Sequence, residues 1–284
     1  MIRDQIRSTS NRLAASGIPD ARLEADLIWM TALGVDRPTL YGMHYDEPSI
    51  KHSSKASELL EQRLERQPMA YLMGTKEFYG LDFEVAPGVL IPRSDTETLV
   101  EESIAICRSQ LRGNPIAAVD VGCGTGVVSI SIASSIPHIC FTAVDVATRA
   151  LQMTRSNAQK NYVYGQINAL KANLTTGIHS GIDLLVANLP YVRSQEIPLL
   201  EPEISLYEPR EALDGGEDGL DLFRAVLSDV PRKMNAPSAL LFELDPREMA
   251  IASRIAQTAF PQANVRTVRD LAGRHRVLVI ECPA

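Results

Sequence analysis

The chain has 284 residues, of which 45% are hydrophobic, and this length is sufficient for two domains with separate cores. No apolar run approaches the roughly eighteen residues that span a membrane, and no basic and apolar leader is recognisable, so we expect a cytoplasmic protein without a membrane partner. The net charge of −7 disfavours a broad phosphate-binding surface. The 4 cysteines show no C-x-x-C or matched histidine spacing, which predicts reduced, mostly buried thiols and no metal site.

The first part of the chain has the periodicity of helices. One helix is expected to begin at Pro19-Asp20 and to end at Gly34, and Trp29, next to its core face, is expected to pack rather than to bind a ligand. A second helix is expected from Ser54 to Arg66, where leucines stand among charged residues as in an amphipathic bundle helix. These elements predict a separate helical domain over residues 1–74.

After the helices the pattern changes to short β-type runs. The pairs Tyr79-Gly80 and Pro87-Gly88 separate segments rich in Phe, Val and Leu, which predicts a β-hairpin linker over residues 75–94. The remainder, residues 95–284, is expected to begin with a helix after Asp95-Thr96-Glu97 and to form the second domain.

Within the second domain, apolar strands alternate with helical stretches. Such alternation predicts a parallel, doubly wound α/β sheet. The link between the last two strands is too short for a crossover, so an antiparallel pair is expected there. The strands are expected near residues 116–119, 140–144, 167–171, 184–187, 239–242, 265–268 and 276–280.

A glycine-rich turn follows the first of these strands and precedes a helical stretch over residues 127–135. Strand, glycine turn and helix form the front of a mononucleotide-binding βα unit, in which glycines let the backbone approach a ligand and free N–H groups point at it. The spacing is tighter than the dinucleotide G-x-G-x-x-G and lacks the lysine of a P-loop. The expected ligand-binding residues of the turn are Gly122, Cys123, Gly124, Thr125 and Gly126.

Two acids flank this turn at informative positions. Asp120, just before it, would repel a pyrophosphate but attract a sulfonium or an ammonium group. Asp145 ends the next strand about twenty residues after the glycines, where a carboxylate can grip ribose hydroxyls. Asp145 could instead cap the following helix, and that role does not exclude the first.

The apolar strand that begins near Asp183 ends in Asn188-Leu189-Pro190-Tyr191. The Asn188 side-chain oxygen and the Leu189 carbonyl could each accept one N–H of a planar nitrogen, while Pro190 stiffens the turn and Tyr191 covers one side. Alone, this pattern also fits a strand terminator beside a buried tyrosine. Preceded by the acid, the glycine turn and the ribose acid, it predicts a methyltransferase that uses S-adenosylmethionine, with these four residues at the catalytic centre.

The sequence also resembles the HemK/PrmC family over about residues 20–282. The resemblance implies a class I, Rossmann-like methyltransferase domain, joined by a β-hairpin to a small helical domain that recognises the substrate. It further implies S-adenosylmethionine as cofactor and N5-methylation of a glutamine in a peptide chain release factor. In the most specific motif, Arg93 and Glu97 are expected to bind substrate, with a mutual ion pair as the alternative. The motifs that carry the resemblance are Gln67 to Gly74, Glu77-Phe78-Tyr79-Gly80, Ile91-Pro92-Arg93-Ser94-Asp95-Thr96-Glu97, the glycine turn, Asn188 to Tyr191 and Glu208 to Leu213.

Four positions depart from the family pattern. Leu189 replaces a proline, which should keep the backbone carbonyl and change the wall of the pocket. Asp245 stands where the family has glycine, and Asn173 and Leu174, expected beside the adenine, stand where it tends to have an acid and an aromatic residue. These departures leave open a related methyltransferase acting on a small-molecule amine or amide or on an adenine N6. A non-catalytic S-adenosylmethionine-binding module is the third alternative, which the intact Asn188-x-Pro-Tyr191 disfavours.

Overall fold

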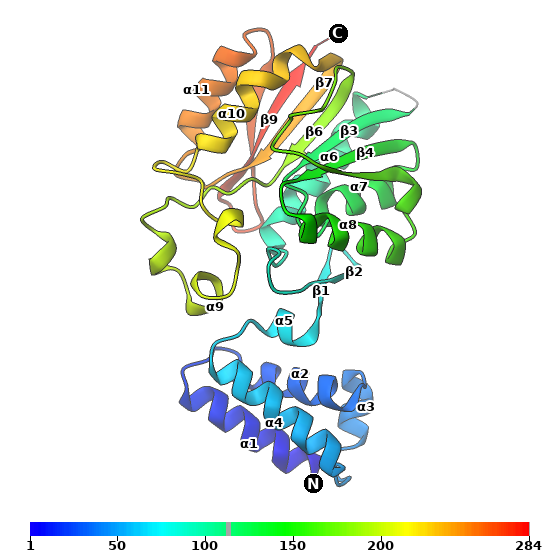
Figure 1. Cartoon of the computed structure of the whole chain (residues 1–284), viewed down its shortest axis with the longest axis vertical. Coiled ribbons are helices and arrows are strands. Elements are labelled where there is room, and N and C mark those ends of the chain that lie inside the picture. Colours follow the sequence, from blue (N-terminus) through cyan, green and yellow to red (C-terminus); the bar gives the residue numbers. More distant parts are fainter. Residues whose placement is uncertain (112–114, 284) are drawn as a thin grey trace. The chain divides into compact units, whose positions relative to one another are not determined.

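The computed structural model describes residues 1–111 and 115–283, which form two compact units (Figure 1). The first unit consists of Met1–Thr75 together with Pro202–Tyr207. The second contains residues 76–201 and the described residues from Glu208 onward. Among the helices described, none combines the length and the apolarity that crossing a bilayer requires.

The first unit is a small bundle of helices. Its core is apolar, and Trp29 is buried in it with its indole Nε1 donating to Thr9 Oγ1 at 3.1 Å, so the expectation that this residue packs in a core is confirmed. Its helices are α1 (Ile2–Ala15), α2 (Ala21–Leu33), α3 (Arg37–Gly42), α4 (Ile50–Leu64) and α5 (Met69–Met73).

The ends of α2 and α4 show which local signals the sequence carries. Helix α2 ends as predicted, because Gly34 adopts φ 72° and its N–H donates to the Met30 carbonyl at 2.8 Å. Helix α4 starts before the predicted Ser54, because the Ser49 side chain accepts the His52 N–H and caps the helix there.

A short segment that is distant in sequence also belongs to the helical unit. It contains α9 (Pro202–Ser205), and its Glu203 pairs with Arg63 at 2.9 Å and with Arg66 at 2.8 Å. The buried Arg63 guanidinium also binds Glu24 at 2.6 Å, so it is held between two carboxylates.

The second unit contains a small hairpin and a large sheet. Strands β1 (Thr75–Phe78) and β2 (Leu81–Glu84) form the hairpin around Tyr79-Gly80. The large sheet has the order β5-β4-β3-β6-β7-β9-β8. Its first five strands in this order run parallel to one another, and β9 runs antiparallel to both β7 and β8. The predicted doubly wound sheet and its antiparallel pair are therefore confirmed. Its strands are β3 (Ile116–Val121), β4 (Ile139–Asp145), β5 (Ile167–Lys171), β6 (Ile182–Ala187), β7 (Met234–Glu243), β8 (Asn264–Arg269) and β9 (His275–Cys282).

Helices cover both faces of this sheet (Figure 1). Helices α6 (Glu97–Ser109), α7 (Val127–Ser135) and α8 (Thr148–Lys160) pack on one face, and α10 (Asp221–Asp229) and α11 (Met249–Ala259) pack on the other. Because both faces are covered, β6 is apolar continuously from Leu184 to Ala187 rather than alternating. The short 3₁₀ turns are Ser94–Thr96, Tyr164–Gln166, Ile197–Leu199, Arg210–Ala212 and Val230–Arg232.

The position of β3 between β4 and β6 determines where functional residues can meet. Val121 near the end of β3 pairs with Val144 of β4 and with Ala187 of β6. Since these strands are parallel, the residues that follow them lie at the same edge of the sheet.

Gly126 at the start of α7 provides a test of this local packing. It has φ 83°, and a Cβ there would lie 2.8 Å from Ile130 Cδ1 and 3.0 Å from Thr154 Cγ2. Gly273 also has a positive φ, 79°, but a Cβ there would have no atom within 4 Å. A substitution at Gly273 therefore measures the cost of backbone strain without crowding. We predict that Gly126→Ala lowers the free energy of unfolding by about 1 to 3 kcal/mol more than Gly273→Ala, as measured by urea denaturation. Equal losses would show that the contacts of Gly126 do not matter.

Candidate active site

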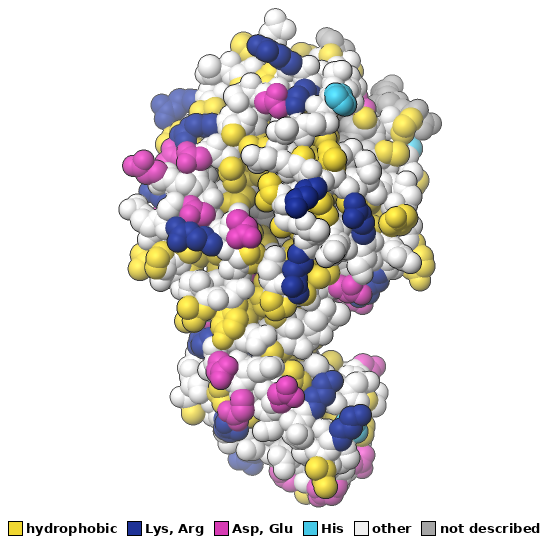
Figure 2. Space-filling view, in the orientation of Figure 1, with side chains coloured by type: hydrophobic (Ala, Val, Ile, Leu, Met, Phe, Trp, Pro, Cys, Tyr) yellow, Lys and Arg dark blue, Asp and Glu magenta, His cyan; other side chains and the backbone are white. Residues whose placement is uncertain are grey.

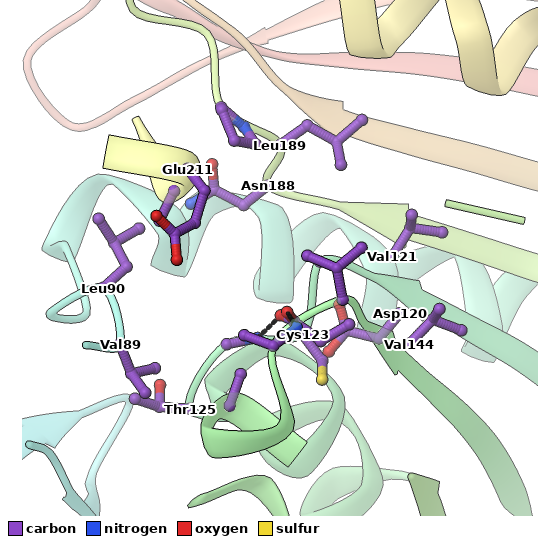
Figure 3. A pocket seen from close by; sticks show the side chains of 18 of the residues that line it. Val89, Leu90, Asp120, Val121, Cys123, Thr125, Val144, Asn188, Leu189 and Glu211 are labelled. Carbon is purple, nitrogen blue, oxygen red and sulfur yellow. Dashed lines mark hydrogen bonds between the residues drawn. The ribbon is translucent and has the colours of Figure 1, made fainter. Parts of the chain in front are cut away.

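A cavity lies at this edge of the sheet, where β3, β4 and β6 end (Figure 3). Asn188, Glu211 and Leu90 surround one part of it, and Asp120, Val121 and Cys123 lie at another. The expected site residues Glu97, Gly126 and Tyr191 are not among those that line it. The expected residues that do line it are Arg93, Asp120, Gly122, Cys123, Gly124, Thr125, Asp145, Asn173, Leu174, Asn188, Leu189 and Pro190.

The glycine turn is held by the neighbouring strand. The N–H groups of Gly122 and Cys123 donate to the Val144 carbonyl at 2.8 and 3.0 Å, and that of Gly126 donates to the Cys123 carbonyl at 2.7 Å. The expectation that free N–H groups of the turn point at a ligand is therefore wrong for these residues, because the fold itself uses them. The positive φ angles of the glycines instead let the backbone form one wall of the cavity.

Asp120 sits at the buried end of β3. Its Oδ2 accepts the Ser129 N–H at 3.2 Å, near the start of α7, and burial raises the pKa of this carboxyl to about 6. A buried carboxylate beside a cavity favours a positively charged ligand, because such a ligand stabilises its ionised form. This environment is compatible with the expected attraction for a sulfonium or ammonium group.

Asp145 ends β4 with both carboxylate oxygens engaged. Oδ2 accepts the Gly124 N–H at 3.0 Å, and Oδ1 accepts the Ala147 N–H at 2.9 Å. Residue Ala147, not Asp145, is the N-cap of α8, so the alternative helix-capping role does not apply in its usual form. Each oxygen of an ionised carboxylate can accept a second hydrogen bond, so the two backbone bonds fix the group and leave capacity toward the cavity.

Asn188 follows β6 and is anchored through its side-chain nitrogen. Its Nδ2 donates to Thr96 Oγ1 at 3.0 Å. The side-chain oxygen is then the atom available to accept an N–H. The neighbouring Leu189 is buried among apolar residues, and a Cβ on Gly122 would lie 3.4 Å from Leu189 Cδ2.

Tyr191 does not cover the cavity as expected. Its hydroxyl turns toward the interior and donates to Glu243 Oε1 at 3.1 Å, at the end of β7. Burial raises the pKa of this phenol, and the nearby charge of Glu243 adds to the effect. The aromatic residue of the motif is therefore joined to a buried carboxylate.

Arg93 and Glu97 do not form the ion pair considered from sequence. Arg93 lines the cavity and pairs with the buried Glu208 at 2.5 Å. Glu97 Oε1 accepts the Tyr79 N–H of the hairpin at 3.1 Å, which gives Glu97 a structural partner away from the lining residues.

The departures from the family pattern differ in their relation to the cavity. Asp245 lies outside the lining and accepts three hydrogen bonds from Arg247, at 2.9, 3.0 and 2.8 Å. Asn173 and Leu174 line the cavity beyond β5, and Leu174 has φ 50°. Asn173, Leu174 and Leu189 can therefore alter direct contacts with a ligand, whereas Asp245 does not line the cavity.

Several residues of the site were missed from sequence. Thr96 and Glu211 line the cavity, and the buried Glu208 and Glu243 hold other site residues. Thr96 and Glu208 stand inside motifs that carry the family resemblance, which is the signal that could have found them.

The cysteines differ in one respect from the expectation. All four are unpaired, but Cys140 is exposed rather than buried. Within the described residues, no group of three or more His, Cys, Asp or Glu side chains is placed to hold a metal ion.

Comparison with known proteins agrees with this geometry. Residues 4–74 match the family model of the PrmC N-terminal domain, and residues 105–202 match that of the methyltransferase small domain. The release factor glutamine methyltransferase of Geobacter sulfurreducens is 37% identical over 282 residues, covering 98% of this chain and 95% of the relative. The MTRF1L release factor glutamine methyltransferase of Homo sapiens is 35% identical over 283 residues, covering 93% of this chain and 82% of the relative.

A solved structure supports the fold. The 16S rRNA N2 G1207 methyltransferase of T. thermophilus, in complex with AdoMet and guanosine, has a TM-score of 0.52 at 13% identity, covering 73% of this chain and 49% of that chain. The sheet order, the glycine turn after β3 and the Asn-x-Pro-Tyr turn after β6 define a class I methyltransferase. With relatives 37% and 35% identical over 95% and 82% of their lengths, the chain belongs to the HemK/PrmC family of release factor glutamine methyltransferases.

Asp145 provides a direct test of cofactor binding. We predict that Asp145→Ala weakens binding of S-adenosylmethionine, measured by calorimetry, by about 1.5 to 3 kcal/mol per lost charge-assisted hydrogen bond. Asp183 is a matched control, because it also accepts a backbone N–H, from Ala117 at 2.8 Å, but does not line the cavity. Unchanged affinity in Asp145→Ala, or an equal loss in Asp183→Ala, would rule out the ribose role.

Proposed function

We propose that this protein transfers the methyl group of S-adenosylmethionine to the side-chain amide nitrogen, N5, of a glutamine in a peptide chain release factor. The observation that carries the proposal is the anchoring of Asn188, whose Nδ2 is held by Thr96 so that its oxygen is left for an N–H of the acceptor. Membership of the family supplies the substrate class.

The chemistry explains why two hydrogen-bond acceptors are needed. An amide nitrogen is a poor nucleophile, because its lone pair is delocalised into the carbonyl group. In the proposed mechanism, Asn188 Oδ1 and the Leu189 carbonyl oxygen each accept one N–H of the glutamine amide. This arrangement favours a pyramidal nitrogen as the new bond forms, so it stabilises the transition state more than the ground state. The remaining acceleration comes from alignment of the nitrogen with the methyl group. No strong base is needed, because the amide proton can leave after the methyl group has been transferred.

The cofactor site in this proposal uses residues from three strand ends. S-adenosylmethionine supplies an electrophilic methyl group on a sulfonium. Asp145 would accept from the ribose hydroxyls, while Asn173 and Leu174 would lie beside the adenine. The buried Asp120 would favour the positive charge of the ligand. The glycine turn would form the wall against which the cofactor packs.

A nucleic-acid acceptor is less compatible with the surface. The net charge is −7, and in the view of Figure 2 basic side chains are interspersed with acidic and apolar ones rather than joined into a continuous basic surface. A protein acceptor needs no such surface. Translation termination takes place where ribosomes are, so we place the activity in the cytoplasm.

The test of the function uses the full-length protein, a release factor and isotopically labelled S-adenosylmethionine. We predict that peptide mass spectrometry locates the label on a glutamine side chain. Asn188→Ala should lower the single-turnover rate by about 10² to 10³, the usual loss for a preorganised transition-state contact, with little change in cofactor affinity. Asn161→Ala is a control, because Asn161 Nδ2 donates to the carbonyls of Asp82 and Asn157 away from the cavity. Label on nucleic acid or a small molecule instead would overturn the acceptor assignment.

We further propose that the helical unit docks the release factor. Deletion of residues 1–74 would also remove Arg63 and Arg66, so the deletion should be combined with Glu203→Gln to avoid an unpaired carboxylate. We predict that this variant retains cofactor affinity but methylates the folded release factor slowly, while full-length Glu203→Gln stays close to the unmodified protein. A full rate in the deletion variant would assign docking to another part of the chain.

A further inference from the structure

One residue of the cavity wall has a strained backbone. Leu174 has φ 50° and is the second residue of a tight turn, in which the Thr176 N–H donates to the Asn173 carbonyl oxygen at 3.0 Å. A positive φ at this place in a turn favours glycine, asparagine or aspartate, because a larger side chain is crowded by its own backbone. Four other described residues besides glycines have a positive φ, but none of them lines the cavity. Such strain persists only where the surrounding structure enforces it, and it is concentrated at ligand sites.

The residue after Leu174 is fixed twice by groups at the end of α10 and just beyond it. Thr175 is buried, and its Oγ1 donates to Asp229 Oδ2 at 2.5 Å. Its carbonyl oxygen accepts from Lys233 Nζ at 2.8 Å, and the same Nζ pairs with Asp229 Oδ2 at 2.5 Å. Hydrogen bonds from Lys233 and Thr175 lower the pKa of Asp229, so this carboxyl is ionised at neutral pH and accepts both bonds.

The loop that carries Leu174 is also fixed at its two ends. The Ala172 N–H donates to the Asp145 carbonyl oxygen at 3.2 Å, at the end of β4. The Ile182 N–H donates to the Lys233 carbonyl oxygen at 3.0 Å, at the start of β6. Because both ends and the middle of the loop are held, Leu174 cannot return to an ordinary φ unless some of these hydrogen bonds are broken.

The Leu174 side chain belongs to an apolar part of the cavity wall. Leu174 packs against the same hydrophobic core as Leu222 of α10, and both residues line the cavity. Val146 and Ala172, which follow β4 and β5, line it as well. Aliphatic side chains suit the flat face of an aromatic base, because such a face loses its contact with water on binding. This part of the wall is therefore suited to a purine.

We propose that Asp229 and Lys233 are positioning residues, which hold Leu174 at its positive φ as the apolar wall for the adenine base of S-adenosylmethionine. They act through their hydrogen bonds to Thr175, since neither of them lines the cavity. This inference rests on the proposed cofactor site. When the bonds to Thr175 are lost, the turn can relax and Leu174 can leave the wall. The apparent affinity for the base then falls, because only a fraction of the molecules has the wall in place.

The binding test uses the full-length protein and two ligands that share the base. S-adenosylhomocysteine is measured by calorimetry and adenosine by NMR titration. We expect Asp229→Asn and Thr175→Val to weaken the binding of both ligands by about 3- to 30-fold. Thr175→Ser, which keeps the hydroxyl, should retain most of the affinity that Thr175→Val loses. Unchanged affinity for adenosine in Asp229→Asn and Thr175→Val would overturn the proposal.

Asp26→Asn is the matched control for these variants. The Asp26 carboxylate also accepts a hydroxyl, from Tyr41 at 2.8 Å, and it also pairs with a basic residue four positions away, Arg22, at 3.4 Å. Asp26 belongs to the helical unit and does not line the cavity. We expect Asp26→Asn to leave the affinity for both ligands unchanged. An equal loss in Asp26→Asn and Asp229→Asn would show a general effect on stability and would contradict the positioning role.

A double-mutant cycle tests whether Asp229 acts through Leu174. Glycine adopts a positive φ without strain and has no side chain to form the wall. Leu174→Gly should therefore weaken binding by itself and make binding insensitive to the group that holds the turn. In the Leu174→Gly background we expect Asp229→Asn to change the affinity for S-adenosylhomocysteine by less than about twofold. Losses that multiply in the double variant would show that Asp229 acts by another route, and they would overturn the proposal.

Hydrogen exchange separates this inference from the proposed function, because it needs neither a cofactor nor a methyl acceptor. The measured group is the Thr176 N–H, which closes the turn. We expect it to exchange about tenfold faster in Asp229→Asn and Thr175→Val than in the unmodified protein. Thr175→Ser and Asp26→Asn should exchange at the unmodified rate. If these rates are seen but the release factor is not methylated, the acceptor assignment fails and the positioning role stands. Equal exchange in Asp229→Asn and the unmodified protein contradicts the positioning role directly.

Discussion

The parallel pairing of β3 with both β4 and β6 is the constraint on which the site depends. It brings the ends of three strands to one edge of the sheet, so Asp120, Asp145 and Asn188 reach the same cavity although they are distant in sequence. The backbone of the glycine turn is fixed to β4 by the same arrangement, since Gly122 and Cys123 donate to Val144 and Gly124 donates to Asp145. A change in strand order would therefore separate the proposed cofactor groups from the proposed acceptor groups.

The cavity combines two different electrostatic environments. On the proposed cofactor side, the buried Asp120 favours a cationic ligand, and Asp145, whose carboxylate is fixed by two backbone N–H groups, favours a ligand with hydroxyl groups. On the acceptor side, polar groups are fixed by other buried polar groups, as Asn188 is by Thr96 and Tyr191 is by Glu243. Preorganisation of this kind suits a reaction in which a weak nucleophile must be aligned rather than deprotonated.

The sequence alone predicted the elements whose signals are local. Residues 167–171 and 127–135 coincide with β5 and α7, because apolar runs and glycine punctuation are read from neighbouring residues. The partner of Arg93 could not be read in this way, since Glu208 lies 115 residues away and meets it only through the folded sheet. The same holds for Asn188 and Thr96, which are 92 residues apart. Tyr191 was misjudged because its local motif does not reveal Glu243 behind it.

The proposed mechanism requires one amide nitrogen to lie between Asn188 and Leu189, in line with the methyl donor. A crystal structure with the demethylated cofactor and a glutamine-containing release factor peptide tests this most directly. We expect the glutamine nitrogen to donate to Asn188 Oδ1 and to the Leu189 carbonyl oxygen, about 3 to 3.5 Å from the position of the transferred methyl group. A glutamine bound elsewhere in the cavity, with its nitrogen contacting neither oxygen, would contradict it.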